Sequence, residues 1–430
     1  MAKYRDFDDD YTYEGEDDYS YITRNEHIRR NNSAGSSQRT YSDTGRRTSS
    51  SSGKSNKSGK KTSKKSKPRK KMKRWVLILI CMLEVLILVG LFGINYILDK
   101  FGKINITPID EEFIMNNEEE MDEETVKTLE GYTNILLLGS DTRDNSVDAL
   151  NQKLNNHTDA IIICSINNDT KEIRLVSVYR DTVLKMSDPE DASHRELRKA
   201  TESTFFYGTA ATLNMINVNL DLKLTDYVMV NWSALIDIID AVGGIDLEIT
   251  EEERIWLNKY LVDTSVNTGK KYKEVPVSGY VHLDGIQATA FCRIRATTGW
   301  DYRRTERQRM VLGEVFKKAK SMNIAQLNAA IEAVVGNVST SLEIKEIMEL
   351  ASYVTQYNLT ETAGFPSKLD DQGKVMVNGK PVEVVAPVDL KYNVSELHRF
   401  LFGTVDYVPT ATVQNISNEI SSSLIYEKTE

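Results

Sequence analysis

The chain is 430 residues long, which allows two or three domains, and its formal net charge is −9. Residues 1–74 hold 20 Lys and Arg against 10 Asp and Glu, a net of +10, which leaves −19 for residues 75–430. The three cysteines provide neither a disulfide framework nor a zinc-binding spacing, which excludes the small disulfide-rich and zinc-finger classes.

Residues 1–74 lack apolar periodicity and pass from an acidic, Tyr-rich run into a Ser/Lys/Gly tract. Such a segment cannot bury enough surface to fold, so we expect a disordered tail. Its basic end suits the anionic headgroups of membrane lipids. Nucleic acid is a poorer partner, because no aromatic residues interleave with the lysines.

Trp75–Leu98 is an apolar run about as long as a bilayer core requires, with Glu84 as its one charged residue. It lies too deep in the chain for a cleaved signal peptide. Lys and Arg crowd its N-terminal flank, whereas the other flank is acidic. The positive-inside rule therefore predicts a single-pass protein of the cell membrane, with a cytoplasmic N-terminus and an extracytoplasmic domain. The scarcity of cysteine in that exported domain favours a bacterial envelope.

Residues 99–130 are predicted to form a stalk with a short helix around Glu118–Leu129. One α/β domain is expected over residues 131–420, followed by a short tail, 421–430. The domain opens with an apolar strand that runs into Gly139, Ser140 and Asp141. Polar residues just past the carboxyl end of a strand commonly line the ligand crevice of α/β proteins, although Asp is also an ordinary turn residue.

The next segment predicts an antiparallel hairpin of two apolar strands, Ala160–Ile166 and Glu172–Val178. A turn at Asp169-Thr170 would pair position 159 with position 180. Asp159 would then lie beside Arg180 and Asp181 at one edge of the sheet. This group is either an ion pair that ends a hairpin or one wall of a site.

Beyond the hairpin, apolar spacing predicts several regular elements and two irregular stretches. Residues 195–208 are expected to be mixed loop and helix around Lys199, and residues 251–280 an irregular, polar surface insertion. The expected elements are helices at 209–220, 232–241, 324–335 and 344–357, strands at 227–230, 375–377 and 382–385, and a helical tail from about residue 412.

Residues 282–309 bring arginines together. Asp284-Gly285 starts a predicted helix that leads into a strand, 291–295. Arg293 and Arg295 would share one face of that strand and repel each other unless an anion lies between them.

A further helix follows, with Asp301 as its predicted N-cap. Arg304, Arg307 and Gln308 are spaced to share one face of it. Arginines in the first turns oppose the helix dipole, and a bound anion would remove that conflict.

The polar side chains expected at one rim of the sheet predict an anion site. They are Asp141, Asp159, Arg180, Asp181, Lys199, Arg293, Arg295, Asp301, Arg304 and Gln308. Guanidinium groups bind phosphate oxygens, and two nearby carboxylates can hold Mg²⁺ between phosphate oxygens. Pyrophosphate with Mg²⁺ therefore fits best. The sequence contains no GxSxG nucleophile motif and no GxxxxGK[ST] phosphate loop.

The chain contains the motifs NILLLGSDTR, TDAIII, SVYRDT, VGG with LDG, and RIR followed by DYRRTERQR. In the order of these motifs the chain resembles the LytR-CpsA-Psr family. The resemblance implies an α/β/α sandwich with a central mixed sheet and an apolar lipid channel. It also implies an extracytoplasmic phosphotransferase that moves a glycopolymer, such as teichoic acid or capsule, from undecaprenyl-pyrophosphate to peptidoglycan.

The same resemblance assigns roles to residues. Asp141 and Asp159 would hold Mg²⁺, Asp301 would act as the general base, and Arg180 and Asp159 would also be catalytic. The residues that would bind the pyrophosphate are Arg180, Lys199, Arg293, Arg295, Arg304 and Gln308. The chain departs from the family in two places, since His157 replaces a frequent Arg and Tyr179 replaces a usual Pro.

Two other functions remain open at this point. One is a non-catalytic sensor or regulator of the cell envelope that binds polyprenyl phosphate and signals through the cytoplasmic tail. The other is a polyprenyl-pyrophosphatase acting on the same lipids.

Overall fold

A computed structural model describes residues 105–140, 157–188, 195–334 and 337–426, all of which belong to one compact unit, Lys73–Glu430. The predicted tail and the predicted membrane span lie outside these ranges. Across the ranges that are described, no helix is both long and apolar enough to cross a bilayer.

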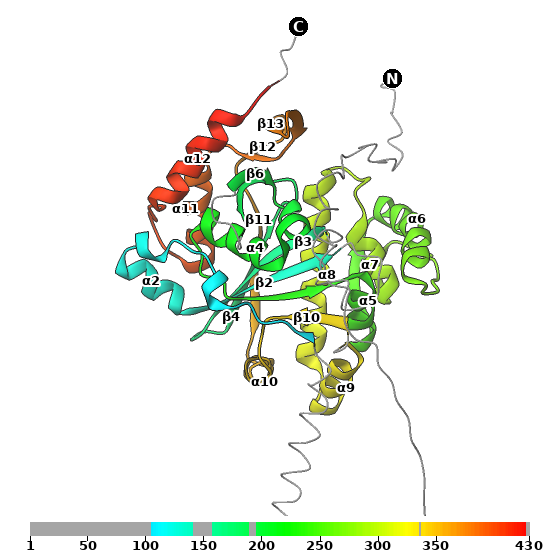
Figure 1. The fold of residues 1–430 in the computed structure, drawn as a ribbon. Coiled ribbons are helices and arrows are strands. Elements are labelled where there is room, and N and C mark those ends of the chain that lie inside the picture. Colours follow the sequence, from blue (N-terminus) through cyan, green and yellow to red (C-terminus); the bar gives the residue numbers. More distant parts are fainter. Residues whose placement is uncertain (1–104, 141–156, 189–194, 335–336, 427–430) are drawn as a thin grey trace, which may run out of the picture. The chain divides into compact units, whose positions relative to one another are not determined.

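A seven-stranded mixed sheet forms the centre of the domain (Figure 1). Its order is β1-β10-β7-β2-β3-β4-β11, with parallel pairs β1/β10, β7/β2 and β4/β11. The α/β class with a central mixed sheet is therefore confirmed. The strands are β1 (Asn105–Ile106), β2 (Tyr132–Ser140), β3 (Thr158–Asn167), β4 (Glu172–Val178), β7 (Asp226–Val230), β10 (Val338–Thr340) and β11 (Asn358–Phe365).

The predicted hairpin is the middle of this sheet, and its register is as expected. Ile161 pairs with Val178 and Ile166 pairs with Ile173. The same register, continued to the open end of the hairpin, brings position 159 opposite position 180. The apolar run of β3 does not alternate because both faces of the strand are buried. Ile161 and Ile163 enter one core, whereas Ile162 and Ile166 enter another.

Helices cover both faces of the sheet (Figure 1). On one face, α4 (Glu202–Leu220), α11 (Leu390–Phe402) and α12 (Ala411–Ser423) pack into the larger core. On the other face, α8 (Trp300–Ser321) and α10 (Ile344–Ser352) pack over Ile162 and Leu175. The sheet is thus the middle of three layers.

A third core lies between α5 (Trp232–Ala241), α6 (Glu251–Thr268), α7 (Gly285–Arg293) and the hairpin of β8 (Ile245–Ile249) and β9 (Gly279–Leu283). The predicted irregular insertion at 251–280 is wrong for its first 18 residues, which form α6. Apolar residues occur all around this helix, so its sequence lacks a clear amphipathic stripe. Its N-terminal capping box, Thr250 with Glu253, was the available signal.

Two further expectations are corrected. The predicted strand at 291–295 is instead the end of α7, which stops at Arg293, and the start of the following loop. The capping box of α7 joins Asp284 and Gln287. The Phe-Cys-Arg-Ile-Arg pattern does not form a strand. The consecutive residues Phe291 and Cys292 are both buried, so the burial does not alternate as it would on a half-exposed strand. Residues 195–199 are strand β6 (Arg195–Lys199), which pairs with β5 (Val183–Ser187).

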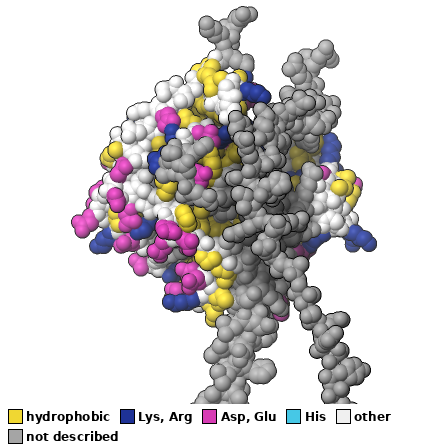
Figure 2. Space-filling view, in the orientation of Figure 1, with side chains coloured by type: hydrophobic (Ala, Val, Ile, Leu, Met, Phe, Trp, Pro, Cys, Tyr) yellow, Lys and Arg dark blue, Asp and Glu magenta, His cyan; other side chains and the backbone are white. Residues whose placement is uncertain are grey.

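Residues from the predicted stalk contact the domain. Strand β1 pairs with β10, and Asn117 donates to the carbonyl oxygen of Val218 at 2.8 Å. Helix α2 (Glu123–Glu130) is capped by Asp122, and Figure 2 shows acidic side chains gathered over it. The other elements are 3₁₀ turns η2 (Glu111–Phe113) and η3 (Glu118–Glu120), helix α9 (Ile324–Val334), and strands β12 (Leu369–Asp370), β13 (Lys374–Val377), β14 (Lys380–Glu383) and β15 (Ala386–Pro387).

Candidate functional site

The candidate site lies where β2 and β4 end and β3 begins. Ser140 pairs with Thr158, and Ile161 pairs with Val178, so Asp159 and Arg180 meet at this edge. The carboxyl ends of β7 and β11 reach the same edge, since both strands run parallel to a neighbour that ends there. The fold therefore gathers loop residues from several strands at one place.

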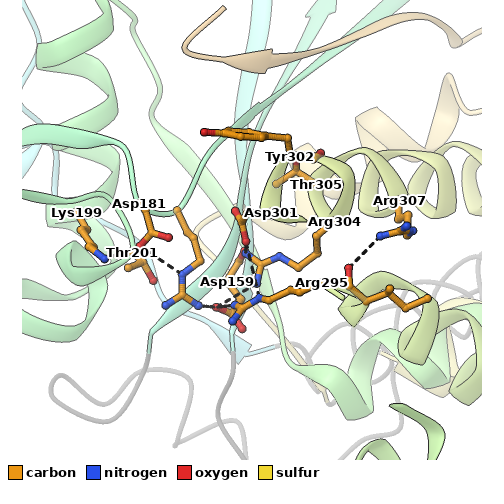
Figure 3. A network of polar contacts seen from close by, with 12 residues as sticks. Asp159, Asp181, Lys199, Thr201, Arg295, Asp301, Tyr302, Arg304, Thr305 and Arg307 are labelled. Atoms are coloured by element: carbon orange, nitrogen blue, oxygen red, sulfur yellow. Dashed lines mark hydrogen bonds and ion pairs between the residues drawn. The ribbon is translucent and has the colours of Figure 1, made fainter. Parts of the chain in front are cut away.

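Asp159 is the centre of a cluster of guanidinium groups (Figure 3). Arg180 donates to its Oδ1, and Arg295 and Arg304 lie 3.6 Å and 4.0 Å from the same oxygen. Arg304 also donates to the backbone carbonyl of Asp159 at 3.2 Å. The turn after β4, the loop after α7 and helix α8 thus each supply an arginine to one carboxylate.

Asp301 is the second carboxylate of the cluster. It lies 2.8 Å from Arg304 and 3.8 Å from Arg295. It is not the N-cap of α8 as predicted, because Gly299 occupies that position and Asp301 falls in the first turn. From there its side chain turns toward Arg304, one turn further along the helix.

Asp181 and Lys199 extend the cluster on its other side (Figure 3). The two side chains form an ion pair at 3.0 Å, and Asp181 lies 3.9 Å from Arg180. Strand β6 positions Lys199 opposite Val183. Thr201 then ties this segment to β3 by donating to the carbonyl oxygen of Thr158 at 2.9 Å.

Positive charge exceeds negative charge in this cluster. Its described members supply four cations and three carboxylates. Burial alone would raise the pKa of Asp159, but Arg304, Arg180 and Arg295 hold that pKa below its usual value, so the carboxylate stays ionised. Arg304 is 2% exposed, and its Nε has no hydrogen-bond partner among the described residues. This arrangement suits an anionic ligand.

Arg293 is not brought to the cluster. It ends α7 and contacts Asp263 at 2.5 Å and Thr264 at 2.7 Å, with its guanidinium 3.6 Å from the ring centre of Trp232. The predicted strand would have aligned it with Arg295. Because the backbone is helical up to residue 293, the two arginines instead have separate sets of contacts.

Arg307 and Gln308 occupy different surroundings. Arg307 is 1% exposed and binds Glu253 at 3.1 Å, together with the carbonyl oxygen of Ile294 and the hydroxyl of Thr297. It therefore fastens α6 and the loop that carries Arg295 to α8. The prediction missed Glu253 because it lies in the segment expected to be irregular. Gln308 has a buried Oε1 without a hydrogen-bond partner in the described part of the chain.

The two departures from the family pattern flank the site. His157 stacks on Phe205 at a centroid distance of 4.4 Å, and burial together with Arg180 lowers its pKa, which keeps the ring neutral at pH 7. Tyr179 lies edge-on to Tyr302, with ring centroids 4.7 Å apart. His157 therefore supplies no charge in place of the frequent arginine, and Tyr179 puts an aromatic ring where a proline is usual.

Of the two carboxylates predicted to bind Mg²⁺, the structure describes only Asp159, because Asp141 lies outside the described residues. Arg180, Arg295 and Arg304 all approach Oδ1 of Asp159, and the group is ionised, as a metal ligand must be. The described ranges contain no group of three or more His, Cys, Asp or Glu side chains suited to a metal. Asp159 fits the role of a single ligand.

Comparison with known proteins gives a family match over most of the domain. The model of the LytR_cpsA_psr family matches residues 103–386. "Biofilm regulatory protein A" of Streptococcus mutans is 27% identical over 214 residues, 49% of this chain and 50% of that protein. "Polyisoprenyl-teichoic acid--peptidoglycan teichoic acid transferase TagV" of Bacillus subtilis is 25% identical over 352 residues, 79% of this chain and 81% of that protein. The chain thus spans only half the length of the first relative.

Solved structures share the fold. A protein of Streptococcus agalactiae superimposes with a TM-score of 0.51 at 22% identity, covering 68% of this chain and 95% of that one. This similarity extends to the domain as a whole and supports the three-layer α/β architecture.

Proposed function

Because this chain belongs to the LytR-CpsA-Psr family, we propose that it is an extracytoplasmic glycopolymer phosphotransferase. Its donor would be a glycopolymer on undecaprenyl-pyrophosphate, and its acceptor a hydroxyl of peptidoglycan. The transferase name of the Bacillus subtilis relative supports this proposal. The observation that carries it is the group of three guanidinium groups around Asp159, of which Arg304 is buried, Arg180 half-buried and Arg295 exposed.

The organisation of the whole chain follows the sequence. A cytoplasmic tail (1–74) would precede one membrane-spanning helix (75–98), a stalk segment (99–130), the catalytic domain (131–420) and a short tail (421–430). From β1 onward the stalk segment packs on the domain, because β1 pairs with β10. This arrangement would hold the domain at the outer surface of the cell membrane, where lipid-linked donors are accessible. An apolar channel for the polyprenyl chain belongs to the same proposal.

In the reaction, the acceptor hydroxyl oxygen attacks the phosphorus that carries the polymer. A new P–O bond forms to the acceptor, the P–O bond to the second phosphate breaks, and polyprenyl phosphate leaves. Asp301 would accept the hydroxyl proton. Arg180, Arg295 and Arg304 would neutralise the pyrophosphate oxygens, which is the main requirement of phosphoryl transfer. Lys199 would add a further cation, and Gln308 a neutral amide.

Mg²⁺ is part of the proposal. Asp141 and Asp159 would hold the ion, which would supply further neutralisation of the phosphate oxygens. The chain's own residues keep distinct tasks, since Asp159 also fixes the orientation of Arg180 and Arg295.

The direct test is a transfer assay. Full-length protein in detergent, given Mg²⁺, a polyprenyl-pyrophosphate-linked glycopolymer and a peptidoglycan fragment, should produce polymer-labelled fragment and polyprenyl phosphate. Arg180→Gln should lower the rate at least about 100-fold, because a charge-assisted contact to the transferring group is lost. Absence of transfer from teichoic and capsular donors alike would reject the proposal.

A regulator is the second candidate, because the Streptococcus mutans relative is named as a biofilm regulatory protein. Deletion of residues 1–70 separates the two functions in cells. A transferase should keep attaching polymer to the wall without this tail, whereas a sensor should lose its output. Release of phosphate without any acceptor would instead favour a pyrophosphatase.

A further inference from the structure

Arg309 is a buried cation, and two of its three guanidinium nitrogens lack a hydrogen-bond partner among the described residues. Its side chain is on a residue only 8% exposed, and neither Nε nor Nη1 has a partner among the described residues. Glu306, the carboxylate that acts on it electrostatically, is engaged by Arg303 at 2.6 Å. An unpaired charge inside a protein is strongly unfavourable unless something compensates it.

Helix α8 directs Arg309 toward the sheet. Positions 302, 305, 309, 312 and 316 follow the three- and four-residue spacing of one helical face. Leu312 and Phe316 on that face pack against the core that contains Ile162 and Leu175. Arg309 lies one turn before them, next to the end of β4.

The sheet presents a second unpaired donor to the same layer. Ser177 is 1% exposed, and its Oγ has no partner within the described ranges. Side chains alternate along β4, so Ser177 faces the same way as Leu175, toward α8. Its neighbour across the parallel ladder is Gly364. The absence of a side chain at Gly364 makes room for the hydroxyl of Tyr179, which a Cβ there would strike.

Tyr179 completes the group. It follows Ser177 by two residues, faces the same layer and is half-buried. It interacts electrostatically with Arg309. Burial raises the pKa of its phenol, so the hydroxyl keeps its proton and remains a donor. The ring lies edge-on to Tyr302 of α8.

We propose that Arg309, Ser177 and Tyr179 form a binding site for a phosphate-class oxyanion, separate from the cluster around Asp159. The three residues contribute donors from α8 and the end of β4, and a tetrahedral oxyanion would satisfy them together. The inference does not depend on the transfer reaction.

The site is distinct from the arginine cluster for two geometric reasons. Past the end of β4, Arg180 contacts Asp159, whereas Tyr179 lies over Gly364 and edge-on to Tyr302. Arg304 and Arg309 are five residues apart, which places them about 140° apart around the helix. One ligand atom therefore cannot contact both Arg180 and Arg309 along these directions.

The oxyanion has two sources to distinguish. It is either free inorganic phosphate or a phosphoryl group carried by a larger molecule. The site's exposed edge lies at the half-buried Tyr179, so an attached group would leave past that ring. Inorganic phosphate and glycerol 3-phosphate serve as the two probes.

The test is the thermal unfolding of full-length protein in detergent, with each probe replacing chloride at constant ionic strength. All proteins carry Arg180→Gln, which weakens binding at the Asp159 cluster. Phosphate should still raise the midpoint in this background, and Arg309→Met should abolish that rise. Lys317→Met, which removes an exposed cation from the same helix, should leave the rise unchanged. Ser177→Ala should weaken the apparent phosphate affinity about fivefold.

Each outcome decides the question. A rise with inorganic phosphate alone assigns the site to the free ion, and a rise with glycerol 3-phosphate assigns it to a carried phosphoryl group. If Arg309→Met does not fold, Ser177→Ala and Tyr179→Phe provide the same comparison with little change in packing. An equal rise with and without Arg309, or with and without the two hydroxyls, would overturn the proposal.

Discussion

Two aspartates, Asp221 and Asp159, are surrounded in opposite ways. Asp221 is fully buried and accepts hydrogen bonds from four neutral donors: Asn117 Nδ2, Tyr407 OH, and the backbone and hydroxyl of Thr410, all within 2.9 Å. Asp159 keeps 22% of its side chain exposed and faces three arginines.

The difference separates a structural centre from a candidate site. Asp221 ends α4 with a positive φ of 53° and ties the segment before α2 to the segment before α12. Every described contact there connects distant parts of the chain, and neutral donors bind a single carboxylate tightly. Around Asp159, by contrast, the cations among the described residues outnumber the carboxylates, and the buried Nε of Arg304 has no hydrogen-bond partner among them. The first arrangement stabilises the fold, and the second is suited to a ligand.

Removing each carboxylate in turn tests whether Asp221 contributes more to stability than Asp159 does. Asp221→Ala should lower the free energy of unfolding by about 3–5 kcal/mol, because several buried donors lose one charged acceptor. Asp221→Asn is the matched control, since Asn tolerates the left-handed backbone and keeps part of the network. Asp159→Asn should lower stability by less than about 2 kcal/mol. Urea unfolding measures all three, and a larger loss at Asp159 would contradict this difference.

Acid should lower stability through His398 beside Asp221, and the lowered pKa of His157 acts in the same direction. His398 stacks on Tyr407 with ring centroids 3.8 Å apart, and burial lowers its pKa from 6.5 to about 4. The unfolded chain therefore binds a proton that the folded chain refuses, so stability falls as pH drops from 6.5 toward 4. The full effect is about 3 kcal/mol.

The depressed pKa of Asp159 acts in a different window. Its contribution to stability is complete above its unfolded pKa, near 3.8, and is lost only as pH falls below that value. Urea unfolding at several pH values, compared with His398→Phe, isolates the histidine. An unchanged slope between pH 6.5 and 4 in His398→Phe would show that another group is responsible.

Arg293 and Arg295 provide a matched pair that sharpens the boundary of the site. Arg293→Met should lower stability by about 1–2 kcal/mol, because the contacts with Trp232 and Asp263 are lost, and should leave pyrophosphate affinity unchanged. Calorimetric titration with farnesyl pyrophosphate measures the affinity. Weaker binding by this variant would restore Arg293 to the site as originally predicted.

Arg295→Gln should give the converse result and the smallest change in stability. Arg295 is 44% exposed and lies 3.6–3.8 Å from its partners, so its loss should alter stability by less than about 0.5 kcal/mol. Farnesyl pyrophosphate affinity should fall about tenfold. The same calorimetric titration measures the affinity, and thermal unfolding measures the stability. A variant that loses stability but keeps its affinity would contradict this prediction.

The sequence predicted the local parts of this fold better than the distant ones. The hairpin register followed from turn chemistry and two apolar runs, which is why Asp159 and Arg180 were placed together correctly. Strand β11 was missed because its parallel pairing with β4 joins segments more than 180 residues apart. Short-range periodicity carries no information about such a pairing.

The site was predicted in part for the same reason. Arg304 reaches Asp159 from α8 and Arg295 reaches it from the loop before α8, while Asp301 contacts these two arginines. The sequence motif implied this grouping without showing its geometry. Arg293 was misplaced because a helix and a strand both accommodate a short apolar run that contains two arginines. Glu253 was missed because α6 has apolar residues on every side. Its partner Arg307, which was predicted to share a helix face with Arg304 and Gln308, connects α8 to α6.

The central claim is that the arginine cluster around Asp159 binds pyrophosphate. The most direct measurement is the calorimetric affinity of the full-length protein for farnesyl pyrophosphate, compared between the natural sequence and Arg180→Gln. We predict at least about tenfold weaker binding by Arg180→Gln, with an unfolding midpoint close to that of the natural protein. Equal affinity in two equally stable proteins would contradict the claim and leave the cluster a structural ion-pair network.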